Sequence, residues 1–412
     1  MGQTLLINPS AFEAGLQAAF EARGTVSQAQ RAAFERFAKT GFPHRRAEGW
    51  KWSDFNSVLR SKNDDASAPS AIIEPSEFAM LDPFEIRVID GRIEIETPNA
   101  HEGLNFGIVD AVATIADLEA HPLASLNVAM SRKAVGIELA DGIQLARPIL
   151  IRHINTGPGR VFAQSLTRIG EGARACVIET FEGEGTGFVS HLYHLALRTG
   201  ARLDRYVLQR TSDDAVVHSL CAPKIEHGAS FNQSGLSTGG ALSRHEVFAQ
   251  FWGTDAQINL NSVALLGGAR HCDFTSEIQF REENCVARQL HKGVAAERAS
   301  NVFQGKFKVE RAAQQTDAKM TANALLLSDQ ADANHKPELE IYADDVECAH
   351  GSTCGSLDDD ALFYLRQRGL SEGQARAILV EAFVGEVIEA IDDLKVRSVF
   401  QTITADWLSQ NG

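Results

Sequence analysis

The 412-residue chain is poor in cysteine, in positive charge and in long apolar runs. Its six cysteines form no Cys-x-x-Cys pair, which argues against a disulfide scaffold or a standard structural zinc site, so we expect free and mostly buried thiols. Lys and Arg number 39 against 54 Asp and Glu, and the resulting net charge of −15 disfavours nucleic acid as a partner. No apolar run reaches the roughly 20 residues that a membrane span needs, and the first twenty residues lack the basic start of a signal peptide. We therefore expect a cytoplasmic protein with no membrane partner.

Motifs for nucleotide binding and hydrolysis are also missing or weak. The sequence has no Gly-x-x-x-x-Gly-Lys-Ser/Thr loop and no glycine fingerprint that opens a helix after a strand. Residues 235–239 match the Gly-x-Ser-x-Gly nucleophile elbow with Ser237 as the nucleophile, but they lack the strand–turn–helix context that this motif requires. The pattern indicates a chance match and leaves a stand-alone hydrolase using Ser237 as the alternative function. A metal-dependent sugar-processing enzyme is a third hypothesis, but the carboxylates in register that it would need are not found.

The middle of the chain contains a repeat. Gly-Ala pairs begin at residues 172, 200 and 228, which is a step of 28, and Asp255-Ala256 continues it with a step of 27. Each pair separates short runs of alternating or β-branched residues, and helical patterning is almost absent from residue 147 to 357. A fixed period of short strands with a turn at each joint is typical of a β-solenoid. We therefore predict a mainly β protein with a parallel β-helix over residues 148–356 and roughly seven coils. A β-sandwich or propeller is the competing architecture.

Helical signals lie on both sides of this core. Capping boxes at Ser10 with Glu13 and at Ser27 with Gln30 predict a helical hairpin within the first forty residues. The whole segment 1–147 is predicted to be an N-terminal helical region with short strands and a linker at about residues 60–78. Trp50 and Trp52 lie beside a cationic cluster. This segment is equally consistent with a docking surface and with an anchor that holds the helices on the next domain.

The C-terminal segment, residues 357–412, is predicted to be helical. Three aspartates at 358–360 suit a helix N-terminus, and Ser371 with Gln374 caps the next helix. The second helix carries an apolar stripe, which is more typical of internal packing but also suits a partner, because a two-helix tail on a rod has little to pack against. The stripe is formed by Ile378, Leu379, Ala382, Phe383, Val387 and Ile391.

The strongest candidate site is the pair Cys348 and His350. In an extended chain, residues two apart point to the same face, and a thiolate with an imidazole suits iron, zinc or copper. One Cys-x-His motif supplies only two ligands, so a stable site needs more from elsewhere, such as another subunit. The pairs His191 with His194 and His271 with Cys272 are weaker candidates, because single histidines on strands are more often hydrogen-bonded structural residues.

An ordered series of segments resembles the SufB/SufD family of iron–sulfur cluster assembly proteins. The segments are residues 303–306, 314–318, 325–328, 336–346, 348–351, 363–366 and 368–369. The run Asp-Asp-Val-x-Cys-x-His-Gly-x-Thr at residues 344–353 is similar to the SufD branch of that family. Met320 stands where Gln is expected and Ser352 where Ala is usual, and we expect neither to touch Cys348 or His350.

The resemblance implies a right-handed parallel β-helix and a scaffold subunit rather than a self-contained enzyme. Its implied partners are SufB, which pairs through the β-helix, and two copies of the ATPase SufC, which bind the C-terminal helices. The implied SufC contacts are Phe363, Tyr364, Arg366 and Phe383. Cys348 and His350 are implied to hold iron or a nascent iron–sulfur cluster at the SufB interface, as transient cargo rather than a permanent cofactor. A homodimer through the same strand edges is the alternative when SufB is absent, and the sequence leaves open whether a flavin binds the complex.

Overall fold

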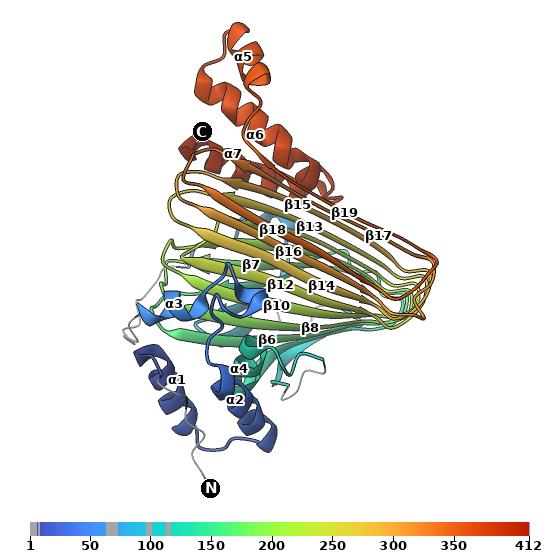
Figure 1. The fold of residues 1–412 in the computed structure, drawn as a ribbon. Helices are drawn as coiled ribbons and strands as arrows, with labels where there is room; N and C mark the ends of the chain where they lie inside the picture. The colour runs from blue at the N-terminus through green and yellow to red at the C-terminus, as the bar shows by residue number, and fades with distance from the viewer. Residues whose placement is uncertain (1–5, 7–8, 63–72, 96–100, 113–116, 412) are drawn as a thin grey trace.

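Two long parallel sheets face each other between helical ends (Figure 1). The computed structural model describes residues 6, 9–62, 73–95, 101–112 and 117–411. Most of the predicted linker at 60–78 therefore lies outside the described residues. Between residues 131 and 358, all of which are described, the chain forms strands and turns without a helix, which confirms the prediction made for residues 147–357.

The strands alternate between the two sheets. The ten-stranded sheet contains β1 (Phe84–Ile89), β2 (Arg92–Ile95), β5 (Ile149–Ile154), β7 (Arg174–Gly183), β9 (Arg202–Thr211), β11 (Ser230–Ser237), β13 (Gln257–Leu266), β15 (Val286–Ala295), β17 (Thr316–Leu326) and β19 (Val346–Gly355). The nine-stranded sheet contains β3 (Leu104–Asp110), β4 (Lys133–Leu139), β6 (Arg160–Ile169), β8 (Phe188–Leu197), β10 (Val216–Ile225), β12 (Leu242–Phe251), β14 (His271–Phe280), β16 (Ser300–Val309) and β18 (Asp332–Ile341). All pairings among the strands from β4 to β19 are parallel, and two strands make one coil, so the chain forms a β-solenoid of about eight coils. The predicted fold class is confirmed.

The strand register explains the repeat in the sequence. Arg174 pairs with Arg202, and Arg202 pairs with Ser230, a step of 28 residues, whereas Ser300 pairs with Asp332 near the C-terminal end. The glycines of the three Gly-Ala pairs have φ angles of 62°, 67° and 63°, a left-handed conformation that costs glycine little. The alanine after each one is buried, so small side chains stack from coil to coil at this corner.

The solenoid sheets begin before residue 148. β1 pairs in parallel with β5, and β4 pairs in parallel with β6, so the chain from residue 84 onward contributes to the same two sheets. Apolar side chains on their inner faces form one continuous core, which includes Val177, Leu203, Phe231, Ile258 and Phe307.

The N-terminal helices pack on the outer face of the nine-stranded sheet. They are α1 (Ala11–Glu21), α2 (Gln28–Thr40), α3 (Phe55–Arg60) and α4 (Pro122–Met130). Both predicted capping boxes are present, and Phe12 and Phe42 meet Phe188 of β8. Trp50 is buried with the guanidinium of Arg244 3.9 Å from its ring centre, so Trp50 anchors this region to the solenoid.

Three helices, not two, form the C-terminal end: α5 (Asp359–Gln367), α6 (Glu372–Glu389) and α7 (Leu394–Asn411). Val380, Val384 and Val387 of α6 pack against the outer face of the ten-stranded sheet together with side chains of α7. The expectation that this tail has little to pack against is therefore wrong. The predicted apolar stripe is also partly wrong, because Ile378 and Ala382 are exposed. Helix α6 is apolar around most of its circumference, so hydrophobicity alone does not fix which face is buried. No helix in the described part of the chain is long and apolar enough to cross a bilayer.

Candidate functional site

The C-terminal coil of the solenoid is open on its outer side. β18 pairs only with β16, and β19 pairs only with β17, so each strand offers an unpaired backbone edge (orange and red in Figure 1). Side chains along both strands are half-buried or exposed, in contrast to the buried strands of earlier coils. An unpaired edge of ten residues is a template on which another chain can add a strand.

Cys348 and His350 lie on β19 and face the inside of this open coil. Their partners on β17, Ala318 and Met320, are both buried in the core, so the predicted shared face is confirmed. Because no coil covers them, Cys348 is half-buried and His350 is exposed. Partial burial raises the pKa of the Cys348 thiol, and the Asp317 carboxylate raises it further. The pair thus places a protonated thiol and an accessible imidazole at the rim of the solenoid.

The two residues that depart from the family pattern lie beside His350. Met320 is its partner across the β17–β19 pairing, and Ser352 is the next residue on the same face of β19. The expectation that neither residue touches the Cys348 and His350 pair is therefore wrong for His350. The physical reason is the coil length, because residues 30 positions apart stack directly on each other here.

Sequence reasoning missed two further residues on this face, His335 and Cys354. His335 lies on β18 with its Nδ1 atom 2.8 Å from the Ser352 hydroxyl oxygen, and Cys354 is the next inward-facing residue after Ser352. The position of the turn between β18 and β19 is a sequence signal from which His335 could have been predicted. Residues 335 and 352 are equally far from the turn formed by residues 342–345, so they face each other.

The four predicted SufC contacts divide between two positions. Helix α5 projects from the solenoid (Figure 1) and has no buried residue. It carries Arg366 and two exposed aromatic side chains, Phe363 at 64% exposure and Tyr364 at 57%. Phe383 lies on α6 instead, half-buried with the Lys292 ammonium 4.7 Å from its ring centre. Three of the contacts thus share one free helix, and the fourth takes part in packing.

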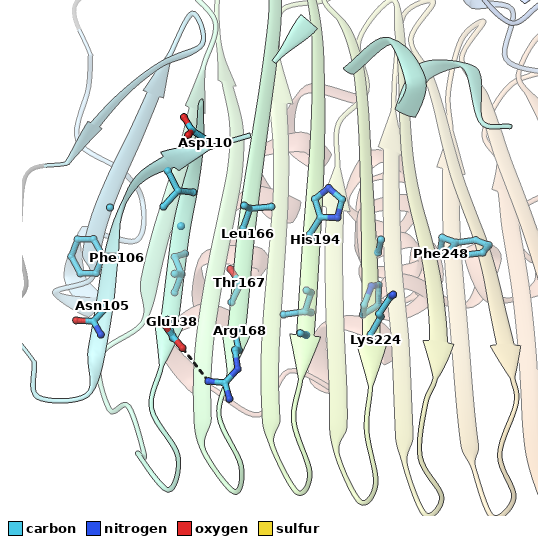
Figure 2. Close-up of a pocket in the computed structure, with 18 of the residues that line it drawn as sticks. Asn105, Phe106, Asp110, Glu138, Leu166, Thr167, Arg168, His194, Lys224 and Phe248 are labelled. Atoms are coloured by element: carbon cyan, nitrogen blue, oxygen red, sulfur yellow. Dashed lines mark hydrogen bonds and ion pairs between the residues drawn. The ribbon is translucent and has the colours of Figure 1, made fainter. Parts of the chain in front are cut away.

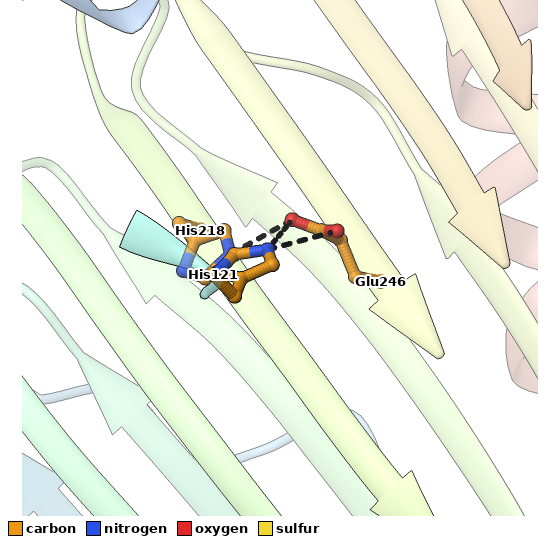
Figure 3. Close-up of side chains that lie close together, drawn as sticks. All are labelled: His121, His218 and Glu246. Atoms are coloured by element: carbon orange, nitrogen blue, oxygen red, sulfur yellow. Dashed lines mark hydrogen bonds and ion pairs between the residues drawn. The ribbon is translucent and has the colours of Figure 1, made fainter. Parts of the chain in front are cut away.

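A second cluster, on the outer face of the nine-stranded sheet, has the residue types of a metal site (Figure 3). The Nε2 atoms of His121 and His218 lie 3.1 and 3.0 Å from Oε1 of Glu246. However, Nδ1 of His121 accepts a hydrogen bond from the Ala124 N–H at the start of α4, which fixes the ring proton on Nε2. That nitrogen therefore donates to Glu246 and has no lone pair for a metal. Arg244 already neutralises Glu246, with Nε 3.0 Å from Oε1, so the cluster ties α4 to the sheet.

A third cluster lies inside the solenoid. Nε2 of His153 lies 3.1 Å from Oε1 of Glu179, and Nε of Arg205 donates to Oε2 at 2.8 Å. Burial alone would raise the pKa of Glu179, but Arg205 and the histidines His191 and His153 lower it well below the usual range. The carboxylate is thus ionised and paired with an arginine, which is the arrangement that makes a buried charge tolerable. The cluster needs no metal ion to balance its charge.

A groove of about 830 Å³ lies on the outer face of the nine-stranded sheet, at the end opposite β18 and β19 (Figure 2). Phe106, Leu166 and Phe248 line it together with His194 and Lys224. Burial, and secondarily the Lys224 ammonium, lowers the pKa of His194 to about 4, so this histidine is neutral near pH 7. His194 lies on the opposite face of β8 from the buried His191, so these two candidate ligands do not meet.

The other candidates from the sequence are structural. Ser237 is fully buried, its hydroxyl donates to Gln209, and it accepts a hydrogen bond from the Gly239 N–H at 3.1 Å. A substrate has no access to this hydroxyl. His271 and Cys272 point to opposite faces of β14, His271 toward Ser53 at 3.0 Å and Cys272 into the core. All six cysteines are free, as predicted, but only three of them, Cys221, Cys272 and Cys285, are buried, so the expectation of mostly buried thiols is wrong.

Comparison with known proteins identifies the family. The model described as "SUF system FeS cluster assembly, SufBD core domain" matches residues 152–383, which is more than half of the chain. The chain is also 30% identical to the iron–sulfur cluster assembly protein SufD of Escherichia coli over 91% of each protein. The chain belongs to the SufB/SufD family. The chain is also 30% identical to the chloroplastic protein ABCI7 of Arabidopsis thaliana over 63% of this chain and 58% of that protein. It is 34% identical to an iron–sulfur cluster assembly SufBD family protein of Synechocystis over 49% of this chain and 44% of that protein.

Within the SufB/SufD family the chain is SufD-like, because its match to SufD spans nearly the whole length of both proteins. The matched core domain runs from β5 to α6, so it includes the open coil with Cys348 and His350 as well as α5. The chain is therefore an iron–sulfur cluster assembly protein of the SufBD type, and its open coil brings two unpaired strand edges together with the Cys348 and His350 side chains.

Proposed function

We propose that this chain is a cytoplasmic scaffold subunit of the SUF complex, in which it pairs with SufB and binds SufC. The observation that carries the proposal is the open coil. Its two unpaired edges, on β18 and β19, lie beside Cys348 and His350 on the inner face of the same coil. A single surface thus combines the means to add a partner strand with ligand types that suit iron.

SufB is the partner proposed for these edges. A solenoid must cap or pair its terminal strands, because their free N–H and C=O groups otherwise invite uncontrolled association. A second solenoid of the same family offers edges of matching spacing and length. In the absence of SufB, two copies of this chain would satisfy the same edges, which is the basis for a homodimer of the isolated protein.

Cys348 and His350 are proposed to hold iron or a nascent cluster as cargo at this interface. Thiolate and imidazole are both ligands of iron–sulfur centres. Because the pKa of the Cys348 thiol is raised, iron binding there would release a proton and would be favoured at higher pH. The two side chains cannot complete a coordination sphere alone, so SufB is proposed to supply the remaining ligands.

SufC is proposed to bind the exposed aromatic surface of α5. The sequence has no nucleotide-binding loop, so ATP hydrolysis is assigned to SufC and no catalytic residue to this chain. Phe363 and Tyr364 are large side chains on a helix without buried residues, a position that costs free energy unless a partner covers it.

Co-expression with SufB and SufC tests the assignment. The expected result is a stable complex with one copy of this chain, one SufB and two SufC, measured by native mass spectrometry. Hydrogen exchange of the amides of β18 and β19 should slow in the complex relative to monomeric chain. If this chain, co-expressed with folded SufB and SufC, purifies without SufB, the proposal is contradicted.

A further inference from the structure

A chain of hydrogen-bonded side chains runs through the core to the open coil. Ser262 Oγ lies 2.8 Å from His291 Nδ1, and His291 Nε2 lies 3.1 Å from Asn301 Oδ1. Asn301 Nδ2 lies 3.5 Å from His335 Nε2, and His335 Nδ1 lies 2.8 Å from Ser352 Oγ. The five residues come from β13, β15, β16, β18 and β19, so the chain of contacts links successive coils up to the exposed end.

The amide of Asn301 sets the direction of this chain. Its Oδ1 atom only accepts, so His291 carries its proton on Nε2 and accepts from Ser262 at Nδ1. Its Nδ2 atom only donates, so His335 accepts at Nε2 and carries its proton on Nδ1. His335 therefore donates to the Ser352 oxygen, and the hydroxyl hydrogen of Ser352 is left to donate outward.

Both histidines are neutral, as this direction requires. Burial, with a smaller effect of His335, lowers the pKa of His291 to about 3. Burial also lowers the pKa of His335. Each ring thus has one donor and one acceptor nitrogen near pH 7. The donor and acceptor roles along the hydrogen-bonded series from the core to Ser352 are therefore fixed.

Gly293 makes room for this arrangement. Its backbone has an ordinary strand conformation, so glycine is not required there by a positive φ angle. A Cβ atom at residue 293 would instead lie 2.0 Å from Asn301 Nδ2. The absence of a side chain at Gly293 thus allows the Asn301 amide to reach His335.

We infer that Ser352 is a positioning residue of the cluster site: its hydroxyl, oriented by His335, donates a hydrogen bond to sulfur held beside His350 or Cys354. Ser352 lies between these two residues on one face of β19, and each is the adjacent inward-facing position. Hydrogen bonds to the sulfur atoms of a cluster stabilise it and tune its reduction potential. The inference rests on the proposed function, since it assumes that the open coil holds a cluster.

The first test uses the full chain alone and needs no cluster. Nitrogen-15 NMR of the His335 ring, assigned by comparison with His335→Gln, reports which nitrogen carries the proton. The expected result is a proton on Nδ1 and a bare Nε2 at pH 7. A proton on Nε2 would leave Nδ1 as an acceptor, so the Ser352 hydroxyl would donate its hydrogen to His335 instead of to sulfur. That result would overturn the inference.

The second test uses the complex with SufB and SufC, loaded anaerobically with Fe²⁺ and sulfide. Iron loss to a chelator should be about tenfold faster in Ser352→Ala than in the wild type, with assembly unchanged, because outer hydrogen-bond partners typically change metal retention by that factor. Ser352→Thr, which restores the hydroxyl, should recover the slow rate. Thr353→Ala is the matched control, since Thr353 faces outward and bonds to Asn323.

The outcomes separate the two proposals. A wild-type complex that takes up no cluster overturns the proposed function and this inference with it. A wild-type complex that holds a cluster, together with a Ser352→Ala complex that loses iron at the wild-type rate, overturns the inference alone.

Discussion

At the scale of single residues, the polar interior makes stability depend on pH. Burial lowers the pKa of His245 and of His291 to about 3, below the ordinary histidine value of 6.5. Each side chain is therefore neutral in the folded protein and gains a proton on unfolding once the pH falls below about 6.5. The free energy of unfolding should fall by about 1.4 kcal/mol per pH unit for each of them between about pH 6 and pH 4, and should be fully retained above pH 7. Urea titrations at pH 7, 6 and 5 measure this slope.

A matched pair of variants assigns the effect. His245→Gln should lower the slope of unfolding free energy against pH by the contribution of one histidine, and His245→Gln/His291→Gln should lower it by the contribution of two. Equal unfolding free energies at pH 7 and pH 5 for the wild type would contradict the account of the buried histidines.

At the scale of elements, α5 should behave as a separable binding surface. A Phe363→Ala/Tyr364→Ala variant should weaken SufC binding by about 30-fold or more, since large aromatic residues at the centre of an interface are typically worth 2 kcal/mol or more. The melting temperature should not change, because neither side chain packs on the solenoid. Calorimetric titration of SufC into the complex of this chain with SufB provides the measurement. Leu394→Ala, at an exposed residue of α7, is the control and should bind SufC normally.

The elements also show which sequence signals are local. Capping boxes at Ser10, Ser27 and Ser371 predicted helix starts correctly, because each depends on residues within one turn. The buried face of α6 was not predicted, and α7 was not distinguished as a third helix within the predicted helical segment 357–412. Helix α6 packs on the distant strands β13 and β15, and α7 packs against α6 in the same apolar cluster, which no local pattern reports.

At the scale of the whole molecule, the solenoid was predictable because one coil repeats. Glycine turns and buried alanines recur at the coil length, so a pattern in the sequence carried the architecture. The candidate site was only half predictable. Cys348 and His350 share a strand and could be paired by their spacing, but Met320 comes from the previous strand of the same sheet and His335 from the opposite sheet. Such neighbours follow from the register between coils, which lengthens from 28 residues to 32 toward this end.

The central claim is that the open coil of this chain holds the nascent cluster together with SufB. The most direct test is the iron and sulfide content of the complex when His350→Ala is co-expressed with SufB and SufC. Because His350 is exposed and contributes nothing to the core, the account predicts normal assembly of the three proteins with loss of the cluster. A His350→Ala complex with full cluster content would contradict it.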